Sequence, residues 1–166
     1  MAATSNVLQN YEQLSYGSPN LSMHRAKARQ VIADAVATRT LTAREAGALC
    51  CMDSAAGVVY TLPAPVIGME FEFCTTVTRT SNAHKIITDA ATTFIMGSVG
   101  MLNNAAATGQ AFSADGTTIR ALSSNGTTTG GIIGDYYRVT AVSTTQWFIQ
   151  GLLLQSGVAA TPFAVS

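Results

Sequence analysis

The sequence predicts an all-β protein: an antiparallel β-sandwich, jelly-roll-like, with an extended N-terminal arm. Short runs of branched and aromatic residues recur from residue 49 onward, and turn-forming residues separate them. The length of 166 residues suits one domain that buries a real core. We therefore divide the chain into an arm, residues 1–38, and a β-sandwich domain, residues 39–166.

The composition excludes several classes of protein. Charged residues make up 11% of the chain, against a typical share of about 25%, and nine basic residues balance nine acidic ones. A nucleic-acid partner would require an excess of Lys and Arg, and disorder would require high charge with low hydrophobicity, so we expect neither. Because a neutral surface does not oppose association, we expect a subunit that covers part of its surface in an assembly.

Neither a membrane segment nor a metal site is expected. The first thirty residues hold no apolar core of signal-peptide length, and no run approaches the ~20 apolar residues of a spanning helix. Cys50, Cys51 and Cys74 cannot all pair within one chain, and no second Cys pair or His motif lies at metal-site spacing. We interpret them as reduced, partly buried thiols of a chain made in a cytosol.

The N-terminal arm carries the candidate docking residues. Its first part is polar and aperiodic, and Tyr11 and Tyr16 are typical of an arm that docks on another surface, although a frayed terminus fits as well. The densest positive cluster follows, and an extended backbone would place Arg25, Lys27 and Arg29 on one side. These residues either dock on an acidic partner or form a solvated basic face.

Eight runs beyond the arm are typical of strands. They are Leu49–Met52, Val58–Leu62, Met69–Val77, Lys85–Thr88, Thr93–Met96, Thr118–Leu122, Tyr136–Val142 and Gln146–Leu154. Alternation in the third run predicts Phe71 and Phe73 inside and the intervening glutamates outside. Asp115-Gly116 and Asn125-Gly126 favour hairpins between antiparallel neighbours. Residues 28–36 fit a helix face or a strand equally well.

Catalytic groups are sparse. A set of Ser81, His84 and Asp89 lies in one short segment without a nucleophile elbow, so we interpret His84 as a surface residue beside a turn. The glycine-rich stretch 130–134 leads into a strand pattern rather than a helix, so hairpin glycines explain it better than a phosphate cradle. We expect no enzyme activity and no cofactor.

Several segments of residues 39–152 resemble a module of tailed-phage virion proteins. In that module a strand ends in a Thr-Leu-Pro turn, a Gly opens the next strand, and an alternating Phe-rich strand follows. The matching segments here are Thr40–Gly47, Leu49–Pro65, Ile67–Phe73, Ser81–Ala90, Ile95–Gly97 and Asp135–Gly151.

Within that group the chain is most similar to capsid decoration, or cement, proteins. The resemblance implies a homotrimer on the outside of a virion that binds the major capsid protein and joins its neighbouring subunits, after synthesis in the host cytoplasm. One alternative is a head-fibre or tail-fibre knob, with residues 103–116 recognising a host receptor. Another is a carbohydrate-binding sandwich module, which Trp147 disfavours because its strand looks buried.

Overall fold

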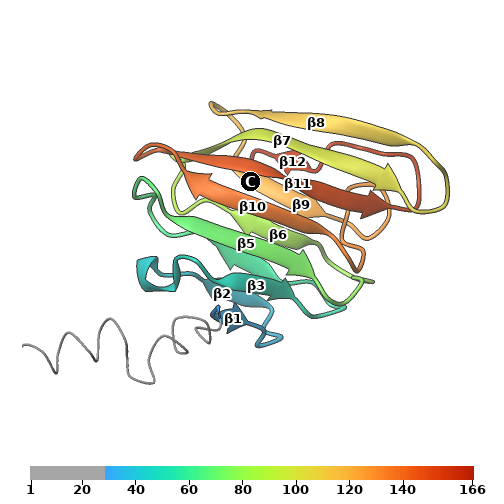
Figure 1. The fold of residues 1–166 in the computed structure, drawn as a ribbon, viewed down its shortest axis with the longest axis horizontal. Helices are drawn as coiled ribbons and strands as arrows, with labels where there is room; N and C mark the ends of the chain where they lie inside the picture. Colours follow the sequence, from blue (N-terminus) through green and yellow to red (C-terminus); the bar gives the residue numbers. More distant parts are fainter. Residues whose placement is uncertain (1–28) are drawn as a thin grey trace, which may run out of the picture.

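The computed structural model describes residues 29–166, which form two mixed β-sheets lying one in front of the other (Figure 1). The order in sheet A is β1 (Val31–Ile32), β3 (Leu49–Met52), β5 (Glu70–Thr75), β10 (Tyr136–Ala141), β11 (Gln146–Gln155), β7 (Phe94–Asn103) and β8 (Gly109–Asp115). The order in sheet B is β12 (Phe163–Ala164), β9 (Ala121–Ser124), β6 (His84–Ile87), β4 (Val59–Thr61) and β2 (Thr38–Thr40). A 3-10 helix (Ala43–Glu45) connects β2 to β3.

The first six strands alternate between the sheets. Strands β1, β3 and β5 lie in sheet A, whereas β2, β4 and β6 lie in sheet B. Two consecutive strands therefore make one turn of a flattened coil, and equivalent strands of successive turns are parallel neighbours. The register stacks Ile32, Cys50 and Phe73 in one buried row, while Leu41 and Leu62 are both buried just after β2 and β4.

The second half of the chain adds two hairpins to sheet A. Strands β7 and β8 pair antiparallel, as do β10 and β11, and β11 then joins β7 in a parallel ladder of ten residue pairs. Strand β10 pairs antiparallel with β5, which attaches these hairpins to the coil. Strands β9 and β12 complete sheet B.

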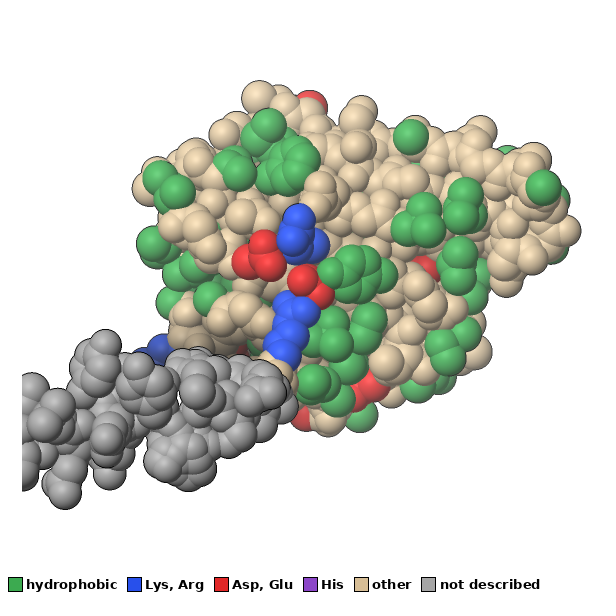
Figure 2. Space-filling model, in the orientation of Figure 1, with side chains coloured by type: hydrophobic (Ala, Val, Ile, Leu, Met, Phe, Trp, Pro, Cys, Tyr) green, Lys and Arg blue, Asp and Glu red, His purple; other side chains and the backbone are tan. Residues whose placement is uncertain are grey.

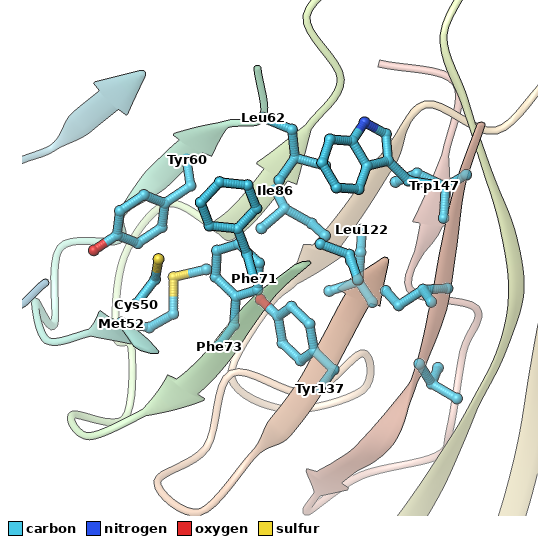
Figure 3. Close-up of a cluster of buried hydrophobic side chains, with 14 of the residues drawn as sticks. Cys50, Met52, Tyr60, Leu62, Phe71, Phe73, Ile86, Leu122, Tyr137 and Trp147 are labelled. Atoms are coloured by element: carbon cyan, nitrogen blue, oxygen red, sulfur yellow. The ribbon is translucent and has the colours of Figure 1, made fainter. Parts of the chain in front are cut away.

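The core lies between the two sheets (Figure 3). Its largest fully buried side chains are Trp147, Tyr60, Tyr137, Phe71 and Phe73. The Phe73 ring stacks on Tyr137 with centroids 5.3 Å apart, and it meets Tyr60 from sheet B at 5.6 Å. The predicted inward positions of Phe71 and Phe73 in β5 and the buried Trp147 strand are confirmed, because all three side chains are fully buried.

Three expectations need correction. Five of the ten strand pairings are parallel, so the sandwich is not antiparallel throughout, and its strand order does not confirm a jelly roll. Asp115-Gly116 and Asn125-Gly126 close no hairpin, because each carries the chain from one sheet to the other. Strand β8, which the small residues after Thr108 concealed, lies within residues 103–116, where no strand was predicted.

One short strand lies before residue 38, where we place the end of the arm, and a second begins there. Strand β1 pairs with β3, and β2 begins at Thr38 and pairs with β4, so residues 31, 32 and 38 take part in the two sheets. Of the two alternatives for residues 28–36, the part from residue 29 onward forms a short strand and no helix.

Candidate functional site

The outer face of sheet A carries exposed apolar side chains across three adjacent strands. Alternation directs Tyr136 of β10 and Phe148 and Leu152 of β11 away from the core, with exposed fractions of 43%, 36% and 44%. Tyr136 is the cross-strand partner of Leu152. Leu102 of β7 is 43% exposed and extends this surface. We call these four residues the outer apolar patch; exposed apolar groups gathered on one face are typical of interaction surfaces.

A row of alternating charges crosses the same face beside the outer apolar patch (Figure 2). Arg138 lies 3.6 Å from Glu70, whose carboxylate also accepts a bond from the Thr140 hydroxyl at 3.4 Å. Glu72 pairs with Arg29. Burial opposes ionisation of Glu72, but hydrogen bonds from Tyr136 and Arg29 outweigh it, so the pKa of Glu72 is lowered. The four charges therefore neutralise one another within the chain.

Arg29 is the one predicted docking residue that the structure describes. Its Nε donates to the carbonyl of Gly47 at 2.6 Å, and a second nitrogen donates to Ala48 at 3.1 Å. With the Glu72 ion pair, these bonds fix the backbone before β1 against β3 and β5. The other predicted docking residues lie outside the described residues: Tyr11, Tyr16, Arg25 and Lys27. The described chain therefore begins beside the outer face of sheet A.

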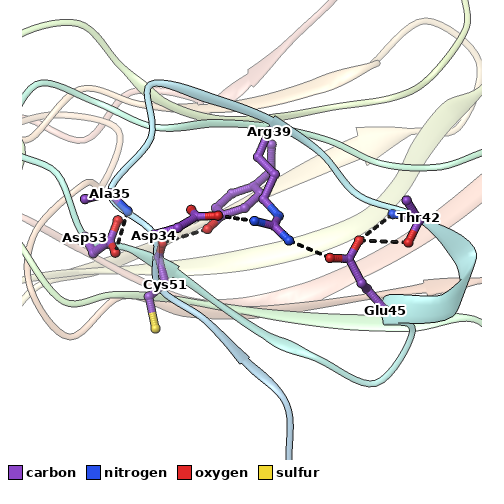
Figure 4. Close-up of polar contacts among 8 residues, drawn as sticks. Asp34, Ala35, Arg39, Thr42, Glu45, Cys51 and Asp53 are labelled. Carbon is purple, nitrogen blue, oxygen red and sulfur yellow. Dashed lines mark hydrogen bonds and ion pairs between the residues drawn. The ribbon is translucent and has the colours of Figure 1, made fainter.

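A polar cluster covers the first turn of the coil, as Figure 4 shows. Arg39 pairs with both Asp34 and Glu45. The Glu45 carboxylate also accepts the Thr42 N–H at 2.8 Å and the Thr42 hydroxyl at 2.9 Å. Burial opposes ionisation of Glu45, but the Arg39 and Thr42 bonds together lower its pKa. Arg39 is the cross-strand partner of Tyr60 in the parallel β2–β4 pair. This cluster therefore covers the end of the core at β2.

His84 is a buried residue, which corrects its interpretation as a surface histidine. It is 1% exposed; its Nδ1 accepts the Val58 N–H at 3.1 Å, so the other nitrogen, Nε2, donates to the Val77 carbonyl at 3.2 Å. Burial lowers the pKa of His84, so the ring is neutral at pH 7. Both nitrogens hold backbone groups, so no nitrogen is available as a base for Ser81.

The glycine-rich loop encloses a buried carboxylate, a feature that the sequence interpretation missed. Asp135 is 1% exposed, and its two oxygens accept the N–H groups of Gly131 and Leu154, both at 2.6 Å. A Cβ on Gly130 would lie 2.8 Å from this carboxylate, which explains why a glycine stands there. Burial raises the pKa of Asp135 to about 6. The loop therefore holds an internal acidic group and is not a hairpin.

The remaining chemistry-bearing groups form no metal site. Within residues 29–166, no group of three His, Cys, Asp or Glu side chains is placed to hold a metal ion. Cys51 and Cys74 are cross-strand partners with sulfur atoms 3.7 Å apart, and the three cysteines are free thiols. In that same described range, no helix is long and apolar enough to span a membrane.

A small pocket lies at one end of the molecule, where β7 and β11 finish. Its volume is about 300 Å³. The lining residues are Asn103, Thr108, Gly109, Gln110, Gln155, Gly157, Val158 and Ala159. Residues 103–110 belong to the segment that the knob alternative singled out, although they form the ends of two strands and the turn between them.

Comparison with known proteins identifies no relative of this chain. No family model, curated protein or solved structure matches it.

Proposed function

We propose that this protein is a virion structural protein that decorates the outside of a phage capsid and links neighbouring major capsid subunits. The outer apolar patch is the observation that carries the proposal. Tyr136, Phe148 and Leu152 are each more than a third exposed, on a chain with few charges and no net charge. Covering this patch with another protein removes apolar area from water, which stabilises the complex.

The place of Arg29, where the described residues begin, supports the same proposal. Arg29 holds the start of the folded domain beside the outer face of sheet A, so the arm and the outer apolar patch can engage one partner together. Two linked contacts bind more tightly than either does alone, because the second forms at a high effective concentration. We propose a homotrimer, in which three such pairs of contacts would act on the capsid surface.

Co-sedimentation with expanded capsids of the same virus tests this proposal. Deletion of residues 2–28 retains Arg29 and its bonds, so we expect a folded domain that no longer sediments with capsids. Phe148→Glu with Leu152→Glu places two charges in the outer apolar patch, and we expect the same loss. Val165→Glu is the matched control, because Val165 is 59% exposed and follows β12 at the edge of sheet B.

A knob domain that binds a host receptor is the second candidate function. The pocket beside Asn103 and Gln110 favours it, because a recessed site with a few polar groups can bind a small part of a receptor. Labelled protein applied to host cells separates the two functions: a knob binds the cells, whereas a decoration protein binds the capsid.

A further inference from the structure

The pocket contains a buried amide whose hydrogen bonds are incomplete. Gln155 is 4% exposed, and within residues 29–166 its Oε1 has no hydrogen-bond partner. A buried amide oxygen without a donor is destabilising, and most such groups in proteins are paired. Gln155 lines the pocket, and the torsion that orients its terminal amide is soft. A ligand in the pocket can therefore supply the missing bond after a small rotation of the amide.

The rim of the pocket is held in place before any ligand binds. The Asn103 Oδ1 accepts the N–H groups of Ala105 and Ala106 at 2.8 and 3.1 Å, and its amide nitrogen donates to the Gly157 carbonyl at 3.3 Å. These bonds join the β7–β8 turn to the segment after β11. A preformed rim lowers the ordering cost of binding.

The lining defines the chemistry of the ligand. Every side chain around the pocket is uncharged, so an ion gains nothing there. Thr108 and Gln110 are exposed at the pocket and, together with Gln155, offer both donors and acceptors. Val158 and Ala159 provide an aliphatic wall. A volume of about 300 Å³ lies at the small end of ligand sites.

We propose that this pocket binds one neutral sugar unit. Sugar hydroxyls both donate and accept hydrogen bonds, which matches the amides of Gln110 and Gln155, while the C–H face of the ring packs on Val158. The site is independent of the capsid-binding proposal, because it lies at the end of the sheets and not on the outer face of sheet A. A single small unit of this kind binds with a Kd on the order of 1–10 mM.

Ligand-observed NMR on the full chain tests the proposal with glucose, galactose and N-acetylglucosamine as probes. We expect saturation transfer to at least one of them, and at least a tenfold weaker Kd in Gln155→Met. Because Met replaces the unpaired oxygen with an apolar group, Gln155→Met should unfold at a temperature no lower than that of the wild type. Gln30→Met, an exposed substitution away from the pocket, should bind as the wild type does.

Three results would overturn the inference. The first is no saturation transfer to any of the three sugars at millimolar concentrations with the wild type. The second is binding that persists unchanged in Gln155→Met combined with Gln110→Ala. A short uncharged peptide is the comparison probe, and binding of the peptide without any sugar would also reject it.

Discussion

His84 and Asp135 are two buried titratable residues, and each holds backbone groups of neighbouring segments. His84 joins the turn before β4 to the segment after β5 through Val58 and Val77. Asp135 joins the glycine-rich loop to β11 through Gly131 and Leu154. Burial lowers the pKa of His84 and raises that of Asp135, because the charged form is disfavoured in both cases.

The two residues give opposite pH dependences to the free energy of unfolding. The pKa of His84 is lowered in the folded state, so its contribution is present above 6.5 and is lost as the pH falls. The pKa of Asp135 rises from 3.8 to about 6, so its contribution is present below 3.8 and is lost as the pH rises through 6. We expect Asp135→Asn to make stability fall more steeply between pH 6.5 and 4 than in the wild type. Thermal unfolding at several pH values measures this, and an unchanged slope would contradict it.

Removing the His84 ring should destabilise the fold at neutral pH. His84→Phe leaves the Val58 N–H and the Val77 carbonyl without partners, at a cost of about 1–3 kcal/mol for each group. Denaturant unfolding at pH 7.5 measures the loss. Replacing a surface histidine would change the free energy of unfolding very little. A change below about 0.5 kcal/mol would therefore show that the His84 ring is not buried.

At the scale of single elements, the strand positions follow from the sequence but their partners do not. Branched, aromatic and other apolar runs located β3 exactly and β10 and β11 within one residue, because these runs are dense in apolar residues and polar turn segments flank them. Short turns such as Asp53-Ser54 look alike whether the chain reverses within a sheet or crosses to the other. The coil of parallel strands was therefore missed, as was β8, which has a single large apolar residue, Phe112.

The candidate site was less predictable from the sequence than the strands were, because its residues meet through the pairing of distant strands. Arg29 stood out by charge, but its partners Gly47, Ala48 and Glu72 are brought to it by parallel pairing of distant strands. The outer apolar patch similarly depends on the β10–β11 register, which places Tyr136 beside Leu152. Sequence spacing alone carries no information about such neighbours.

Alanine substitutions at two glycines of sheet A, Gly151 and Gly100, test how tightly its central strands pack. A Cβ on Gly151 would lie 2.4 Å from the Tyr136 carbonyl oxygen, and backbone cannot move aside easily. At Gly100 the nearest atom is the Leu152 Cδ1 at 3.1 Å, on a side chain that can shift. We expect Gly151→Ala to destabilise the fold by about 3 kcal/mol and Gly100→Ala by less than about 1 kcal/mol. Equal losses in denaturant unfolding would show that the β10–β11 contact is looser than described.

The polar cluster around Arg39 should protect the edge of the coil locally. Arg39→Gln removes the ion pairs with Asp34 and Glu45, so β1 and β2 should exchange their amide hydrogens faster. Hydrogen exchange in β7 and β11 should stay unchanged. These two strands form a long parallel ladder, and in the strand order of sheet A they lie far from β1. Hydrogen exchange followed by mass spectrometry measures both regions, and uniform acceleration would contradict a local role.

At the scale of the whole molecule, a neutral chain carries the outer apolar patch and the Arg29 attachment on the same face of sheet A. The charges on that face are paired within the chain, so they add little repulsion against a neighbouring surface. The pocket lies at the end of β7 and β11 and is lined by none of the four residues of the outer apolar patch. These features fit a subunit that adheres by one face while its sheet ends remain accessible.

Copy number in the virion tests the capsid-decoration proposal most directly. Quantitative mass spectrometry of purified particles gives the ratio of this chain to the major capsid protein. We predict hundreds of copies per particle, comparable with the number of capsid subunits, and their loss from particles assembled with the variant lacking residues 2–28. A few tens of copies or fewer, unaffected by the outer-patch substitutions, would contradict decoration and identify a fibre or spike component.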